Sequence, residues 1–166
     1  MSESLNICLS CGFCCNGTTI GFVMLDSEEL SEIRALMDIE EEDEKGFILQ
    51  PCNSFGCNGC NIYAQRPKHC DEYRCEILKS VENKELDFDA ATKVINAVGQ
   101  KKVAIEKHLA TLDFELKSRS FYFKVLELKK LLCKDELSLS QSHKELMSDI
   151  EEMDKLLSKY FGISFN

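Results

Sequence analysis

Apolar residues recur every three or four positions in the second half of the chain, which is the spacing of an amphipathic helix. The first such stripe follows Asp87, a residue type that caps helix N-termini, and it continues past Gly99. Its members are Ala91, Val94, Ile95, Val98, Ile105, Leu109, Leu112 and Leu116. This pattern predicts one long helix.

Two more helices are predicted after it. Ser118 or Ser120 starts the first, whose apolar residues are Phe121, Val125, Leu128 and Leu132. Ser142 and Glu145 have the spacing of a capping box, and Gly162 stands where glycine commonly ends a helix. The stripe between them consists of Leu146, Ile150, Met153, Leu157 and Tyr160. Because one amphipathic helix cannot bury its stripe alone, the three should pack together or over the rest of the chain.

The pattern in the first half is shorter and mixed. Residues 18–25 are apolar and β-branched enough for a short buried strand, and residues 46–50 for another. Residues 26–29 have the composition of a helix start, and the apolar face that follows consists of Leu30, Ile33, Leu36 and Met37. The acidic residues 38–45 fit a solvated loop or a frayed helix end.

These elements predict an α+β fold that is mostly α. We expect an irregular cysteine-rich module with short strands over residues 1–80. Residues 81–166 should form a bundle of about three helices that packs on this module as one compact unit.

Cysteine adds chemistry to this picture. Nine of the ten cysteines lie between residues 8 and 75: Cys8, Cys11, Cys14, Cys15, Cys52, Cys57, Cys60, Cys70 and Cys75. Thiolates are soft ligands that select zinc, Cu(I) or iron–sulfur centres over magnesium or calcium. The tenth, Cys133, stands among apolar residues and is expected to be a buried structural thiol.

Charge and hydropathy narrow the possible partners. The net charge is −9, and residues 1–75 alone carry 13 acidic against 5 basic residues. Nucleic acid and anionic membranes are therefore poor partners, because binding phosphate requires clustered Lys and Arg. No apolar run of membrane-spanning length occurs, and residues 1–7 do not resemble a secretory signal. We expect a cytoplasmic protein, in which clustered cysteines bind metal more often than they form disulfides.

The cysteine spacings indicate metal knuckles. Cys8-x-x-Cys11 is followed by Gly12, whose positive φ would let backbone amides point at sulfur. Cys57-x-x-Cys60 is followed by Asn61, which tolerates the same conformation. Cys70 and Cys75 are separated by little more than one helical turn. Residues 52–75 contain so much Asn, Gly and Cys that we expect no regular structure there without a metal.

Two ordered motifs resemble a known family. They are Cys8-x-x-Cys11-x-x-Cys14-Cys15 and Cys60-x-Ile62-Tyr63-x-x-Arg66-Pro67-x-x-Cys70-x-x-Tyr73-x-Cys75, with Cys52 between them. In these residues the chain is similar to the YkgJ-type CxxCxxCC cysteine-cluster proteins, which are zinc- or iron-chelating domains. The resemblance implies a bound metal. The chain departs from the family pattern at Asp71, where Arg is usual, and at Cys57, which is additional.

The spacing of the cysteines bears on which metal is bound. Cys8, Cys11 and Cys14 copy part of the bacterial ferredoxin run, and Cys52, Cys57 and Cys60 copy part of the plant-type run. Two zinc knuckles would explain the paired cysteines equally simply. They explain the adjacent pair Cys14-Cys15 less well, and the eight cysteines of the family pattern could fill two four-sulfur sites. We favour iron–sulfur over zinc, and the sequence leaves open which of this adjacent pair ligates.

Two other residues of the second motif are expected to lie next to the cysteine ligands without binding the metal themselves. Arg66 either offsets thiolate charge or pairs with the acidic helix after residue 26, and Tyr63 packs its ring over the cluster. No nucleotide-binding loop and no recognisable catalytic motif accompanies them. Our first hypothesis is a small metal-binding protein with a protein partner, acting in electron transfer, metal handling or support of a modifying enzyme. The alternatives are a cluster-dependent enzyme that modifies a protein or peptide by redox or methyl-transfer chemistry, and a zinc-stapled interaction module.

Overall fold

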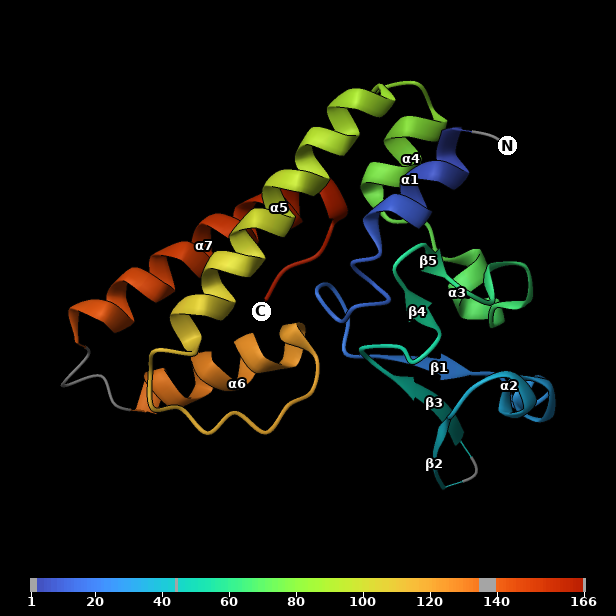
Figure 1. Cartoon of the computed structure of the whole chain (residues 1–166), viewed down its shortest axis with the longest axis horizontal. Helices are drawn as coiled ribbons and strands as arrows, with labels where there is room; N and C mark the ends of the chain where they lie inside the picture. Colours follow the sequence, from blue (N-terminus) through green and yellow to red (C-terminus); the bar gives the residue numbers. More distant parts are fainter. Residues whose placement is uncertain (1–2, 44, 135–139, 166) are drawn as a thin grey trace. The chain divides into compact units, whose positions relative to one another are not determined.

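The computed structural model describes residues 3–43, 45–134 and 140–165 (Figure 1). The chain is mostly helical with small antiparallel sheets, so the predicted α+β class is confirmed. Within these residues the chain divides into two compact units. The first is Met1–Arg74 with Arg119–Tyr122, and the second is Cys75–Ser118 with Phe123–Asn166.

The first unit contains short elements joined by turns. In chain order they are α1 (Glu3–Cys11), β1 (Phe22–Leu25), α2 (Leu30–Leu36), β2 (Glu40–Glu42), β3 (Lys45–Leu49), β4 (Phe55–Gly56), β5 (Gly59–Cys60), the 3₁₀ turn η1 (Tyr63–Gln65) and α3 (Lys68–Glu72). Residues 52–75 therefore contain a hairpin and a short helix, and the expectation that they lose regular structure without a metal stays a prediction. The hairpin forms because the Cys57-Asn58 turn pairs Gly56 with Gly59.

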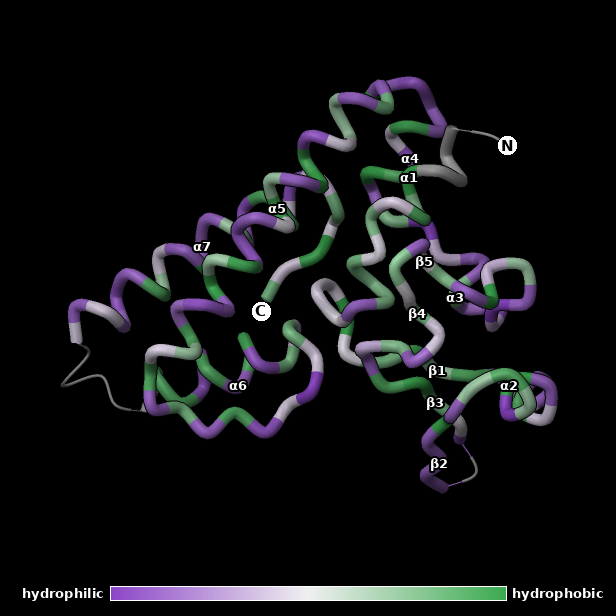
Figure 2. Tube along the Cα trace, viewed as in Figure 1, coloured by the Kyte–Doolittle hydropathy of each residue, from purple (hydrophilic) through white to green (hydrophobic). Residues whose placement is uncertain are grey.

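Strand β3 lies between β1 and β2 and is antiparallel to both. Figure 2 shows apolar colours along β1 and β3 and hydrophilic colours along β2. The buried residues Leu25, Ile33, Met37 and Ile48 form the core beneath this sheet. The Gln50 amide continues the β1–β3 ladder by donating to the Gly21 carbonyl at 2.9 Å.

Two expectations for this unit need correction. The first strand begins at Phe22 rather than at residue 18, because the amides of Thr18 and Thr19 donate to the Phe13 carbonyl instead of to a strand. Part of the acidic run is strand rather than loop, since Glu40–Glu42 pair with β3. All three glutamates are exposed, so pairing needs no burial of charge.

The second unit contains α4 (Glu76–Glu82), α5 (Phe88–Leu109), most of α6 (Phe121–Lys134) and α7 (Gln141–Phe161). Helices α5 and α7 run side by side (Figure 1). Asp87 caps α5 as predicted, accepting from the Ala90 amide at 2.7 Å. Gly162 ends α7 with φ 69°, also as predicted. The apolar stripe of α7 is buried at Leu146, Ile150, Met153, Leu157 and Phe161.

Three details of the helical half differ from expectation. Helix α5 ends at Leu109, before Leu112 and Leu116, because Thr111 Oγ1 and the Leu112 amide make local turn bonds to the carbonyls of His108 and Leu109. Helix α7 is capped by Ser140 rather than by Ser142. Cys133 is exposed and not buried. No helix in the described ranges has both the length and the apolarity to cross a membrane.

The helical packing predicts a stability difference. Leu146 is completely buried, whereas Val103 on α5 is 49% exposed. Leu146→Ala should lower the free energy of unfolding by about 2–5 kcal/mol, because it leaves a cavity in the core. Val103→Ala should change it by less than about 0.5 kcal/mol. Urea titrations followed by circular dichroism measure both, and equal losses would contradict this packing.

Candidate metal centre

Helix α1 delivers the first cysteines. Cys8 and Cys11 lie in its last turn, so the predicted knuckle at this motif is wrong and a helix end takes its place. Gly12 has the positive φ that the sequence predicted, 61°, and its amide donates to the Cys8 carbonyl at 3.3 Å. A Cβ on Gly12 would lie 2.4 Å from Cζ of Phe55. Glycine therefore both ends the helix and lets the Phe55 ring approach.

The turn after Gly12 carries Cys14 and Cys15. Thr19 Oγ1 donates to Cys14 Sγ at 3.4 Å, which fixes the direction of that sulfur. The Cys52 amide donates to the Cys15 carbonyl at 2.8 Å. This bond ties the first cysteine segment to the one that follows β3.

Cys52 stands at a turn in which the Phe55 amide donates to its carbonyl at 3.1 Å. Burial raises the pKa of Cys52, and the neighbouring backbone amides of Ser54 and Phe55 oppose part of that shift. Cys60 follows on β5, where it pairs with Phe55 on β4. In this hairpin the positive φ is at Gly59 and not at Asn61, because Gly59 packs against the Leu9 backbone of α1.

Helix α3 carries Cys70, and ionic contacts hold this helix to the end of β1. Lys68 Nζ and His69 Nε2 contact the two carboxylate oxygens of Asp26 at 2.9 and 3.1 Å. These hydrogen bonds lower the pKa of Asp26. The Lys68 amide also donates to Glu29 Oε2 at 2.8 Å. Cys70 is thereby placed by charges on its neighbours rather than by a large apolar face.

Arg66 and Tyr63 border the same site. The Arg66 guanidinium lies 3.9 Å from the Tyr63 ring centroid and contacts Asp71 Oδ1 at 2.5 Å. The acidic helix is thus not its partner. Burial opposes the charge of Arg66, but hydrogen bonds with Tyr63 and Asp71 raise its pKa overall. Burial and the neighbouring sulfurs raise the pKa of Cys70 overall, and the Arg66 charge opposes only part of that shift. The role of Arg66 in offsetting thiolate charge stays a prediction.

Five sulfurs interact electrostatically, and we call Cys14, Cys15, Cys52, Cys60 and Cys70 the thiol cluster. Burial, followed by repulsion from the other four, strongly raises the pKa of Cys15. Burial and repulsion from Cys52, Cys14 and Cys60 raise the pKa of Cys70 to about 12. Cys15 and Cys70 therefore stay protonated at neutral pH unless a cation joins them. A soft metal ion could supply that positive charge, because it displaces thiol protons.

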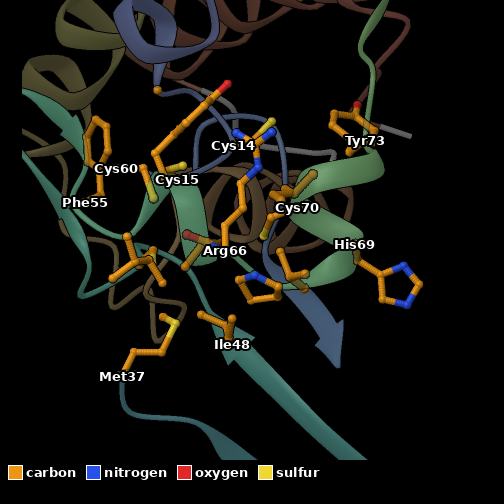
Figure 3. Close-up of a pocket in the computed structure, with 18 of the residues that line it drawn as sticks. Cys14, Cys15, Met37, Ile48, Phe55, Cys60, Arg66, His69, Cys70 and Tyr73 are labelled. Carbon is orange, nitrogen blue, oxygen red and sulfur yellow. The ribbon is translucent and has the colours of Figure 1, made fainter. Parts of the chain in front are cut away.

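The thiol cluster lines one cavity of about 400 Å³ (Figure 3). Cys8, Tyr63 and Arg66 also line it, and its other walls are mostly apolar. Cys11, Cys57 and Cys75 are not among its lining residues, so their role as ligands stays a prediction. Cys57 is exposed at the hairpin turn. Helix α3 ends at Glu72 and Cys75 caps α4, so Cys70 and Cys75 do not share one helical turn.

The donor set fits a metal, although its geometry is not that of a closed site. The structure has all ten cysteines as thiols. Among the described residues, no three or more His, Cys, Asp or Glu side chains are arranged to hold an ion.

Sequence reasoning missed several residues that shape the cavity. Thr19 and Phe55 belong to the turns around the sulfurs, and Phe22, Met24 and Ile48 come from the sheet. The alternation of Phe22 and Met24 within a predicted strand was a usable signal, since it places both on one face. The approach of Phe55 to Gly12 had no local signal.

The chain was compared with known proteins. A family model described as "CxxCxxCC: Putative zinc- or iron-chelating domain" matches residues 7–94, which is just over half of the chain. The match extends beyond Cys75 into α5. No curated protein and no solved structure matches the chain.

Partial burial of the thiol cluster predicts its reactivity. In reduced, metal-free protein, iodoacetamide should modify the exposed Cys57 and Cys133 faster than Cys15 and Cys70, because only accessible thiolates react. Between pH 7 and 9 the Cys70 rate should rise about tenfold per unit without a plateau, since its pKa is higher still. Peptide mass spectrometry measures each rate.

A urea-unfolded sample provides the reference rate for every cysteine in that experiment. If Cys15 and Cys70 react at the unfolded rate in the folded protein, the half-buried thiol cluster is wrong.

Proposed function

This chain belongs to the CxxCxxCC family of zinc- or iron-chelating domains, and we propose that its thiol cluster binds an iron–sulfur centre. The observation that carries the proposal is the convergence of five interacting sulfurs from separate segments at one cavity. The turn after α1, the segment after β3, β5 and α3 each contribute at least one of them.

Cavity size supports iron–sulfur over a lone zinc ion. Four thiolates close around zinc at about 2.3 Å, which leaves almost no space inside the site. The cavity here has about 400 Å³, whereas one water occupies only about 30 Å³ of liquid. A larger inorganic group accounts for more of this space. The ferredoxin-like spacings in the sequence favour the same choice.

We assign the ligands within the thiol cluster as Cys15, Cys52, Cys60 and Cys70. These come from four different segments, so their sulfurs can approach one centre from different directions. Cys14 already accepts a hydrogen bond from Thr19, whereas the Cys15 sulfur interacts with those of Cys52, Cys60 and Cys70. Cys14 therefore lies beside the centre in this assignment, and Arg66 offsets part of the thiolate charge.

In the cell such a centre would serve electron transfer, metal handling or the support of a modifying enzyme, with a protein as partner and the cytoplasm as compartment. A second candidate is an enzyme whose centre takes part in redox or methyl-transfer chemistry. The apolar space next to the sulfurs favours that candidate, because electron transfer alone requires no vacant space. Substrate-dependent turnover would separate the two.

Metal analysis tests the proposal. Protein purified without oxygen should contain iron and acid-labile sulfide in equal amounts and absorb visible light. Cys15→Ser, Cys52→Ser, Cys60→Ser and Cys70→Ser should each lose most of the iron, because a hydroxyl is a poor ligand for a soft metal. Cys133→Ser, an exposed cysteine in the other unit, should keep all of it.

The same series separates the alternatives. Cys14→Ser should retain iron if Cys15 is the ligand of the adjacent pair. Stoichiometric zinc without colour or sulfide would replace the iron–sulfur proposal with the zinc-stapled interaction module. Loss of iron in Cys133→Ser would show that the assignment to the thiol cluster is wrong.

Arg66 should tune the reduction potential. Arg66→Gln removes a positive charge near Cys70, so the more negative reduced state becomes less favourable and the potential falls. Asp71→Asn removes the paired negative charge and should raise the potential. Arg66→Lys should change it least, because the charge is kept. Redox titrations at equal iron content measure these shifts, and unchanged potentials in all three would confine Arg66 to a structural ion pair.

A further inference from the structure

The cavity has chemically different ends. The thiol cluster forms one, and apolar side chains form the other: Phe22 and Met24 of β1, Met37, Ile48 of β3, and Ile62. In Figure 3, Met37 and Ile48 lie on the side of the cavity opposite Cys14. A metal centre bound by the sulfurs would leave the apolar end open.

The apolar end of the cavity has a rigid wall and an opening to solvent. Met37 and Ile48 belong to the buried core, so they cannot move without disturbing the sheet. Phe22 and Met24 are partly exposed while lining the cavity, so they connect it to solvent. Phe22 is held edge-on against Phe47 with 6.4 Å between ring centroids. The cavity volume of about 400 Å³ is within the range of small-molecule sites.

One polar group in this wall has no partner. Gln50 lines the cavity, is only 3% exposed, and is fixed by its backbone bond to Gly21. Its side-chain Oε1 is buried without a hydrogen-bond partner in the described residues. Buried acceptors are almost always satisfied, so an unsatisfied one beside a cavity indicates a missing donor. A ligand with an N–H or O–H group would supply it.

The charges around the cavity disfavour an anion. Arg66 contacts Asp71, and His69 contacts Asp26, so both basic side chains that line the cavity are already paired with a carboxylate. Residues 1–75 carry a net negative charge, to which thiolates on a metal would add. A carboxylate or phosphate ligand would meet repulsion without a new partner. A neutral ligand meets neither obstacle.

We propose that this cavity binds a neutral, mostly apolar small molecule that donates one hydrogen bond to Gln50. Its apolar body lies against Phe22, Met37 and Ile48, next to the thiol cluster. This inference rests on the proposed function. It adds that the space beside the metal centre is a substrate site. Gln50 is a specificity-determining residue of that site.

Indole and 1-methylindole test the proposal, because they share one bicyclic body and only indole has an N–H donor. Each is titrated into the full chain, purified without oxygen and with its metal, by isothermal calorimetry. Indole should bind about five- to tenfold more tightly, the worth of one hydrogen bond to a buried acceptor. Equal affinities, tighter binding of 1-methylindole, or no binding of either probe overturns the proposal without any variant being needed.

Three variants test which side chains contact the probes. Gln50→Met keeps the length of the side chain and removes the acceptor, so it should bind both probes equally. Phe22→Ser should weaken both probes by the same factor. Leu36→Ser is the matched control, because Leu36 is an exposed apolar residue of the same unit, 38% against 45% for Phe22, that does not line the cavity. A preference for indole that survives in Gln50→Met overturns the proposal, as does equal weakening in Leu36→Ser.

Iron and sulfide are measured on every sample. Absent probe binding at full iron content overturns the substrate site and leaves the metal proposal standing. Indole selectivity in protein that contains no iron supports the site and contradicts the iron–sulfur proposal alone.

Discussion

The first unit depends on one electrostatic constraint: five cysteine sulfurs share a small, largely apolar space. Burial and mutual repulsion raise the pKa of Cys15 and Cys70, so these groups remain neutral unless a cation joins them. A soft metal bound as we propose would remove the repulsion and the protons together, and folding of this unit would then be coupled to metal binding.

The sulfurs come together through contacts that involve little apolar surface. Gly12 admits the Phe55 ring, the Cys52 amide bonds to Cys15, and Asp26 holds α3 through Lys68 and His69. Met37 after α2 and Ile48 of β3 add a wall from the buried core. The two proposals assign a metal to the sulfurs of this cavity and an organic molecule to its apolar side chains, with Gln50 as the hydrogen-bond acceptor.

The helical half was predictable because its information is local. The period of apolar residues located α5, α6 and α7, and Asp87 and Gly162 act as end signals through their own backbone geometry. The errors arose where neighbouring groups competed. Ser140 caps α7 while Ser142 is 2.8 Å from His108, which lies more than thirty positions earlier in the chain. Ladder bonds to β3 turn part of the acidic run into strand despite its charge.

The sequence by itself determined the kind of chemistry, because thiol donors select soft metals wherever they meet, and the motif spacing identified the family. It also determined that Gly12 has a positive φ. Tertiary structure decided which cysteines meet: Cys8-x-x-Cys11 became a helix end, and Cys52 is tied to Cys15 by a backbone hydrogen bond. It also made Asp71 the partner of Arg66 and placed Gln50 in the cavity wall. Spacing constrains only neighbours in the chain, whereas a site built from four segments depends on how those segments pack.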